Sequence, residues 1–184
     1  MVWYSVATSP IVLIMKISQE IEAKFNDQIT LEFEASLVYR QLAVEAERMD
    51  LVGMAAWFRH QADEEIVHAN KFIDHVDARD GHVQIGSLSA PAQFADPSAL
   101  DLFEAAFKHE QKVSEAIQNL YRAADEAGDF DSRPILNWFT SEQIEEESTV
   151  DEIIGRIRLV GDDGSGLLRM DSELGARPAT TTEA

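Results

Sequence analysis

An acidic side chain and an imidazole share one face of a predicted helix at Glu65 and His68. The two residues are three apart, so a helix places them on the same side. Phe58, seven residues before Glu65, and Phe72, four after His68, lie on that side too. Burying a lone carboxylate costs on the order of several kcal/mol unless it is paired or binds a metal. The pattern therefore predicts a charge-balancing partner inside the core.

Three further glutamates interrupt apolar helical stripes in the same way. Glu32 lies between Phe25 and Tyr39, and Glu110 and Glu146 lie within the stripes of two later segments. Each of the four acids falls 14 or 15 residues after the predicted N-cap of its helix. In helices of similar length that position is near mid-height, whichever way the helix points. We therefore expect four carboxylates to converge in one layer of one core.

Such a layer requires compensation, because four carboxylates at one level cannot all ionise unaided. The stripes contain no Lys or Arg, whereas two divalent cations would balance the charge. His68 adds a nitrogen ligand and Gln143 a neutral oxygen. Mixed oxygen and imidazole donors suit iron, manganese or zinc better than calcium or magnesium. Glu65 is best placed to bridge two metals, because its helix also carries His68.

Four long helices are predicted to position these residues, because apolar residues recur at three- and four-residue steps over 18–47, 50–78, 96–128 and 131–161. The connections within the first and second pairs are short, which indicates antiparallel neighbours. Residues 80–97 form a long loop rich in Gly, Ser and Pro, able to travel the length of a bundle. The predicted N-caps are Ser18, Asp50, Asp96 (followed by Pro97) and Asp131 (with Pro134 in the first turn).

The expected fold class is therefore all-α: a four-helix bundle over 16–161 with one long crossover between helices two and three. A short amphipathic fifth helix, Leu167 to Leu174, is expected within 162–175, followed by a disordered tail at 176–184. Residues 1–15 carry an apolar patch but no basic residue, so they do not have the pattern of a secretory signal. We expect Met15 to be the functional start; a partner-binding N-terminal tail is the alternative.

Composition excludes several classes of function. The net charge is -19, from 34 acidic and 15 basic residues, so binding to nucleic-acid phosphates is not expected. The absence of cysteine excludes disulfides, thiolate metal sites and cysteine catalysis. No apolar run approaches the roughly 20 residues that a membrane helix needs.

The chain resembles the bacterial non-haem ferritins over residues 15–177. The resemblance rests on four segments in order: LEFEAS (31–36), EEIVH (64–68), KHEQ (108–111) and SEQIEEE (141–147). It implies that Glu32, Glu65 and His68 hold one iron. It also implies that Glu65, Glu110 and Glu146 hold a second, with Gln143 beside it. Tyr39 resembles the tyrosine beside such a centre and is expected among its catalytic residues, and Trp138 resembles a nearby tryptophan.

The resemblance further implies a cytoplasmic ferroxidase that oxidises Fe(II) with O2 or peroxide and stores ferric mineral in a hollow homo-oligomeric cage of twenty-four subunits. Residues 167–174 would then be the fifth helix at the fourfold axes. A third iron site is implied at Glu64, Glu142 and Glu145; a solvated acidic face explains these three residues nearly as well.

Three alternatives are weighed against this interpretation. Haem bacterioferritins have a methionine after the bridging glutamate and a histidine on the fourth helix, whereas here Ile66 and the segment 143–147 offer neither, so no haem is expected. Met54, in an apolar stripe, is expected to be core. A DNA-protecting mini-ferritin would place its metal between subunits and lack the fifth helix. A metal-free interaction bundle would require basic partners for the buried acids.

Overall fold

The computed structural model describes residues 16–176, and those residues form helices joined by loops and turns, with no strand among them. The predicted all-α class is confirmed. The extension expected at 1–15 lies outside the described residues, as do residues 177–184 of the tail expected at 176–184. The elements are α1 (Gln19–Arg48), α2 (Val52–Ala78), α3 (Ala99–Glu126), the 3-10 turn η1 (Phe130–Ser132), α4 (Arg133–Val160) and α5 (Gly164–Gly175).

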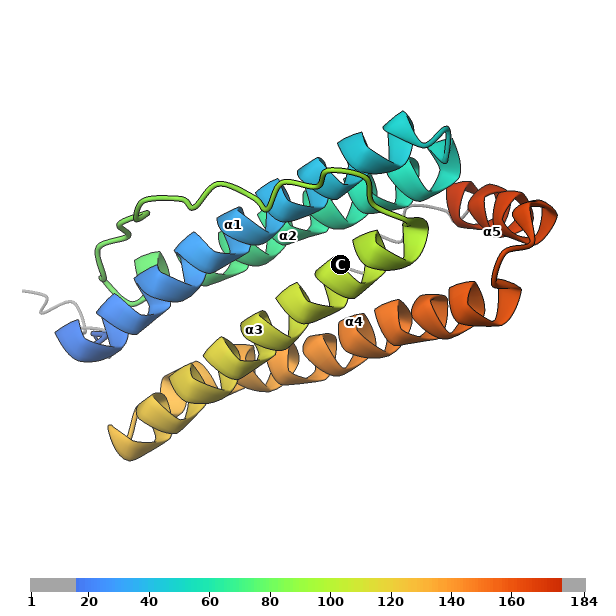
Figure 1. The fold of residues 1–184 in the computed structure, drawn as a ribbon. Helices are drawn as coiled ribbons and strands as arrows, with labels where there is room; N and C mark the ends of the chain where they lie inside the picture. Colours follow the sequence, from blue (N-terminus) through green and yellow to red (C-terminus); the bar gives the residue numbers. More distant parts are fainter. Residues whose placement is uncertain (1–15, 177–184) are drawn as a thin grey trace, which may run out of the picture.

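The four long helices lie side by side in a bundle, with α5 across one end (Figure 1). α1 and α2 run antiparallel, as do α3 and α4. The crossover between α2 and α3 runs along the outside of the bundle from one end to the other, so α3 starts at the same end as α2 and runs parallel to it (Figure 1). This topology brings all four mid-helix acids to the middle of the bundle.

The crossover is held against α1 by a ladder of side chains spaced every fourth residue. In each contact a backbone N–H of the loop donates to an oxygen of α1, at distances of 2.9 to 3.1 Å. One face of α1 is therefore dedicated to fixing the loop. The donor and acceptor pairs are His82 to Glu22, Gln84 to Asn26, Gly86 to Thr30 and Ser89 to Glu34.

Three of the four predicted N-caps are wrong, because the helices begin at other residues in the structure. Asp50 lies in the α1–α2 turn with φ of 60°, and α2 follows Leu51, which provides no side-chain cap. Asp96 is displaced as cap by Ser98, which forms a reciprocal capping box with Asp101: Ser98 Oγ accepts from Asp101 N at 3.2 Å, and Asp101 Oδ2 accepts from Ser98 N at 2.8 Å. Asp131 lies inside η1, so α4 begins two residues later. Ser18 is confirmed, because its Oγ accepts from Ile21 N.

The α2 N-terminus is capped instead from α5. Asp171, 7% exposed, accepts a hydrogen bond of 2.7 Å from the backbone N–H of Met54. The two backbones approach so closely that a Cβ on Gly53 would lie 1.8 Å from the Asp171 carbonyl oxygen, and one on Gly175 would lie 2.8 Å from Gly53 Cα. The fifth helix is therefore docked on α2 through positions that only glycine can fill.

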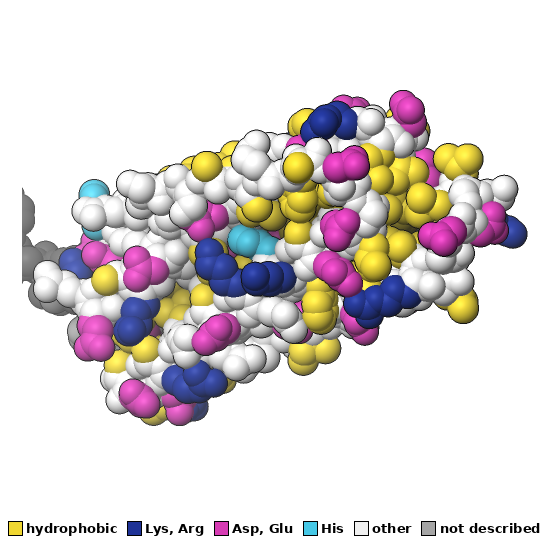
Figure 2. Space-filling view, viewed as in Figure 1, with side chains coloured by type: hydrophobic (Ala, Val, Ile, Leu, Met, Phe, Trp, Pro, Cys, Tyr) yellow, Lys and Arg dark blue, Asp and Glu magenta, His cyan; other side chains and the backbone are white. Residues whose placement is uncertain are grey.

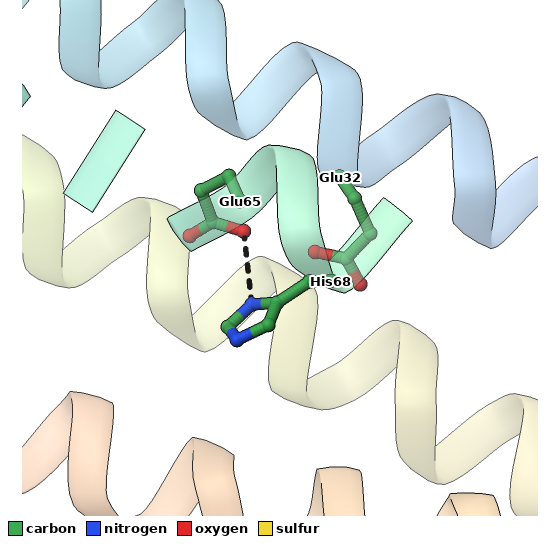
Figure 3. A group of neighbouring side chains, drawn as sticks. All are labelled: Glu32, Glu65 and His68. Atoms are coloured by element: carbon green, nitrogen blue, oxygen red, sulfur yellow. Dashed lines mark ion pairs between the residues drawn. The ribbon is translucent and has the colours of Figure 1, made fainter. Parts of the chain in front are cut away.

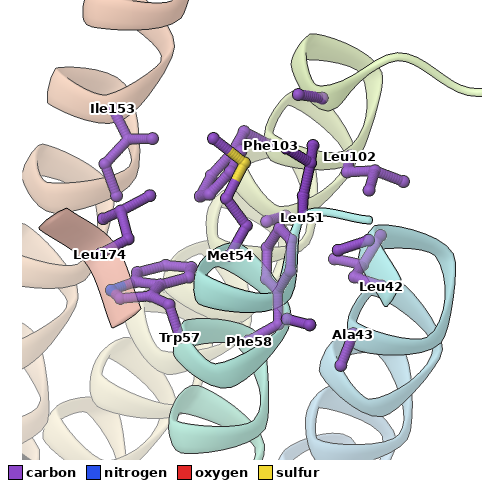
Figure 4. Close-up of a cluster of buried hydrophobic side chains, with 14 of the residues drawn as sticks. Leu42, Ala43, Leu51, Met54, Trp57, Phe58, Leu102, Phe103, Ile153 and Leu174 are labelled. Atoms are coloured by element: carbon purple, nitrogen blue, oxygen red, sulfur yellow. The ribbon is translucent and has the colours of Figure 1, made fainter. Parts of the chain in front are cut away.

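Two apolar clusters fill the bundle on either side of a polar layer. One lies toward α5 and includes Phe58, Phe103 and Leu174 (Figure 4). The other lies toward the opposite end and includes Phe25 and Phe72. The buried polar side chains between them include Glu32, Gln61, Glu65, His68, Glu110, Ser114 and Gln143.

No helix within residues 16–176 is both long enough and apolar enough to cross a membrane.

Candidate metal centre

Glu32 of α1 and Glu65 and His68 of α2 form a tight group in the polar layer (Figure 3). One ligand atom from each lies within 4.8 Å of the others, and the residues are 0%, 3% and 3% exposed. His68 Nδ1 lies 3.4 Å from Glu65 Oε2. Within residues 16–176 this is the one group of three His, Cys, Asp or Glu side chains placed so closely. Two carboxylates and an imidazole are a donor set for a first-row metal.

Glu110 of α3 extends the site across the bundle. Its carboxylate is fully buried and receives two hydrogen bonds, one from the Tyr39 hydroxyl at 2.5 Å and one from Gln143 Nε2 at 3.1 Å. The Gln143 amide also lies 3.4 Å from Ser114 Oγ. Tyr39 and Gln143 therefore orient Glu110 from two different helices.

Glu146 of α4 completes the set of four acids, although it is only partly buried. Gln61 Nε2 approaches both of its carboxylate oxygens, at 3.2 and 3.4 Å. Glu146 repels Glu110, Glu64 and Glu142 strongly enough to alter its own pKa, so these carboxyls share one region of the layer. It does not belong to the compact three-residue group, and it lies at the more open side of the site.

Burial raises the pKa of all four acids. For Glu32 and Glu65 the pKa is raised well above 4.5, first by burial and then by repulsion, from Glu65 and from Glu110 respectively. Burial and the neighbouring acids raise the pKa of Glu146 to about 8. The pKa of Glu110 is also raised by burial, against the opposing effect of the hydrogen bonds from Tyr39 and Gln143. Without a cation, the centre therefore holds protons at neutral pH.

Two carboxylate oxygens in this centre are left for a ligand. Glu32 Oε2 and Glu65 Oε2 are buried and receive no hydrogen bond from an N–H group or a Ser, Thr or Tyr hydroxyl in residues 16–176. The Glu32 and Glu65 carboxyls share a hydrogen bond with each other, which requires a proton on one of them. Buried polar atoms are normally satisfied, so orphaned oxygens that face an imidazole require an explanation. A metal ion with oxygen and nitrogen ligands supplies one, and the residues present fit such an ion.

The three residues expected at a third site lie at the edge of the layer. Glu64 and Glu142 are partly buried, and Glu145 is exposed. Glu64 repels Glu65 and Glu146, and Glu142 repels Glu146. The structure thus brings Glu64 and Glu142 toward Glu146, whereas Glu145 stands in solvent.

Aromatic rings enclose the histidine side of the centre. Trp138 and Phe139 both contact the His68 ring edge-on, with centroids 5.7 and 5.5 Å away. Lys71 Nζ lies 4.5 Å from the centre of the Trp138 ring. These contacts fix the plane of the imidazole.

Three supporting residues of the site were not predicted from the sequence: Gln61 beside Glu146, Ser114 beside Gln143, and Gln28. Gln28, 3% exposed, donates from Nε2 to Glu32 Oε1 at 2.7 Å. It thereby satisfies one oxygen of Glu32 and leaves the other pointing to the layer. Its spacing of four residues before Glu32, in a stripe with Phe25, is the signal that would have revealed it.

The bundle with an acidic layer at its centre is the architecture of ferritin-like proteins. A model of the ferritin family, described as a ferritin-like domain, matches residues 22–160. The bacterial non-heme ferritin of Escherichia coli O6:H1 is 35% identical over 156 residues, which are 84% of this chain and 93% of that protein. That of Staphylococcus aureus strain USA300 is 32% identical over 161 residues, 88% of this chain and 96% of that one.

Solved ferritin structures agree with this result. An engineered closed form of the Archaeoglobus fulgidus ferritin superposes with a TM-score of 0.86 at 34% identity, over 89% of this chain and 99% of that one. The open-pore ferritin of the same archaeon gives a TM-score of 0.85, also at 34% identity, over 88% and 98% of the two chains.

The chain belongs to the ferritin family. Membership of this family supports iron storage as its general role and a homo-oligomeric assembly.

Proposed function

We propose that the polar layer is a ferroxidase centre that binds two iron ions and oxidises them before storage. The single observation that carries this proposal is the pair of orphaned buried oxygens on Glu32 and Glu65 beside His68. One ion would be held by Glu32, Glu65 and His68. The other would be held by Glu65, Glu110 and Glu146, with Gln143 and Tyr39 orienting Glu110.

Iron is the substrate in this scheme. Two Fe(II) ions lose one electron each, and one O2 accepts both electrons and two protons to give hydrogen peroxide; with peroxide as the oxidant, the two electrons and two protons yield water. The carboxyls have two duties. First, they release their protons when iron enters, because the raised pKa values of these four acids mean that the metal-free centre holds protons: Glu32, Glu65, Glu110 and Glu146. Second, the resulting negative charge stabilises Fe(III) over Fe(II).

The test is the initial rate of Fe(II) oxidation in air, followed by ferric absorbance. The double variant Glu65→Ala, His68→Ala should lose rapid oxidation while its assembly, measured by size-exclusion chromatography, stays intact. A matched control is Glu152→Ala, an exposed acid of the same type on α4, which should oxidise iron at the wild-type rate. An unchanged initial rate in the double variant would overturn the proposal.

We further propose a hollow cage of twenty-four copies as the mineral store, and a weaker third iron position at Glu64 and Glu142 with Glu145 toward solvent. The likeness to ferritin structures supports the cage. Iron loading followed by size-exclusion chromatography with iron detection tests both size and mineral together. Iron that elutes away from the protein, or a species the size of one subunit, would contradict the cage.

A further inference from the structure

An apolar cavity of about 470 Å³ lies on the outer side of the bundle, between α1, α3 and the last part of the crossover. Its walls are mainly the side chains of Val38, Leu42, Pro91, Ala92, Phe94 and Ala105. Figure 2 shows this face of the molecule, on which Lys or Arg side chains gather beside a histidine and next to an apolar surface. The volume is within the roughly 300–1,000 Å³ range of small-molecule sites.

The charged residues that line this cavity are all basic. They are Lys108 and Lys112 of α3, and no Asp or Glu among the described residues 16–176 lines the cavity, in a chain with 34 acidic residues and 15 basic ones. Lys112 Nζ lies 3.3 Å from Glu34 and so is partly neutralised. Lys108 is exposed and makes no hydrogen bond or ion pair with another residue of 16–176. The Lys108 ammonium group therefore lies at the rim of an apolar cavity without a partner among residues 16–176.

The wall between these lysines carries a polar atom that the protein leaves unsatisfied. His109 lines the cavity, and its Nε2 is buried without a hydrogen-bond partner in the described part of the chain. This imidazole nitrogen therefore adds hydrogen-bonding capacity to the wall of the cavity.

We propose that this cavity binds a medium-chain fatty acid, with the hydrocarbon chain among Leu42, Phe94 and Ala105 and the carboxylate at Lys108. Burial of the chain provides most of the affinity, because the favourable free energy grows with the apolar area removed from water. The carboxylate selects the orientation, because the described lining contains two lysines and no carboxylate, and the Glu34 carboxylate beside it is paired with Lys112. This site is separate from the acidic layer and does not depend on the proposed ferroxidase activity.

A second cavity on the same side of the molecule does not have these properties. It is also bounded by α1, α3 and the crossover, but its lining includes Asp27 and Glu34 along with Lys24. A fatty acid carboxylate would be repelled there. This second cavity therefore provides matched control positions on the same helices.

The test uses the assembled, iron-free protein and decanoate below its micellar concentration, with binding followed by isothermal titration calorimetry. We expect saturable binding to the wild type. Ala105→Trp should abolish it by filling the cavity, whereas Ala116→Trp, in the second cavity on the same helix, should leave it unchanged. Circular dichroism and size-exclusion chromatography establish that both variants fold and assemble.

The head group is tested without altering the cavity. Lys108→Gln should weaken decanoate binding roughly threefold to tenfold, as expected for loss of one charged contact at a solvent-exposed rim, and Lys24→Gln should not. Decanol should bind to wild type and Lys108→Gln alike. The proposal is overturned if decanoate does not bind, if Ala105→Trp binds it as well as the wild type does, or if Lys108→Gln has no effect.

Discussion

The Tyr39 hydroxyl donates a hydrogen bond of 2.5 Å to Glu110 Oε1, joining α1 to α3 through the centre of the polar layer. Both side chains are fully buried. Because Gln143 donates to the other oxygen, Glu110 has a donor on each side, whereas Glu32 and Glu65 each keep an orphaned oxygen. Of the four acids, Glu110 is therefore the one whose ionised form is best stabilised by hydrogen bonds before a cation binds. We expect the first proton released on metal binding to come from one of the other three acids.

Removing the Tyr39 hydroxyl tests its role in positioning Glu110 without changing the packing of the Tyr39 ring. Tyr39→Phe should leave the fold intact, at a cost of about 1 kcal/mol for the lost hydrogen bond, because the ring still packs against Trp57 and Phe58. It should slow the first turnover of Fe(II) oxidation, since Glu110 loses a donor that holds its orientation. Stopped-flow absorbance with two Fe(II) per subunit measures the effect. A first turnover as fast as in the wild type would show that the contact has no part in the reaction.

The stability of the metal-free protein should fall as the pH rises. The four layer acids have folded-state pKa values raised above 4.5, so their favourable contribution is complete below about pH 4.5 and is lost as the pH passes the folded values, which is about 8 for Glu146. Unfolding temperatures measured in chelator at pH 6 and pH 8.5 should differ, with the lower temperature at pH 8.5.

The control for this pH effect is a pair of amide substitutions on one helix. Glu146→Gln should flatten the dependence on pH, whereas Glu152→Gln, on the exposed side of α4, should not. Addition of zinc should raise the unfolding temperature more at pH 8.5 than at pH 6, because fewer protons then compete with the metal. A stability that increases between pH 6 and pH 8.5 would contradict the account of the layer.

Docking of α5 should depend on Gly53. Any Cβ there would meet the Asp171 carbonyl oxygen at 1.8 Å, and backbone cannot move aside as a flexible side chain can. Gly53→Ala should therefore displace α5, lose the Asp171 cap on Met54 and lower the unfolding temperature. Gly155→Ala is the matched control, because its Cβ meets nothing within 4 Å and alanine in a helix is favoured by roughly 0.5–1 kcal/mol. Equal unfolding temperatures for the two variants would contradict the close approach.

The sequence predicted the helices and the crossover better than it predicted their ends. Apolar periodicity depends on many residues, whereas an N-cap depends on one, and at the start of α3 Asp96 and Ser98 competed for that role. Asp50 was a reasonable candidate by type, but the tight turn requires a left-handed residue there and Asp tolerates it. The true cap of α2, Asp171, lies 117 residues from Met54, and no local pattern could reveal it.

In the candidate site, too, the sequence predicted some residues and missed others. Charged residues in an apolar stripe are visible in a sequence because they break a period, and this is how Glu32, Glu65, Glu110 and Glu146 were singled out. Their supporting residues are ordinary amides in ordinary places. Gln28 could be found only by asking which side chain one turn away reaches Glu32, and the different burial of Glu146 depends on how α4 is rotated in the bundle.

The central claim is that this layer holds two iron ions in each subunit. The most direct measurement is anomalous diffraction at the iron edge from crystals soaked anaerobically with Fe(II). We predict two peaks inside the bundle, one contacted by Glu32, Glu65 and His68, the other by Glu65, Glu110 and Glu146. A map with no peak between the four helices, from crystals that hold iron elsewhere, would contradict it.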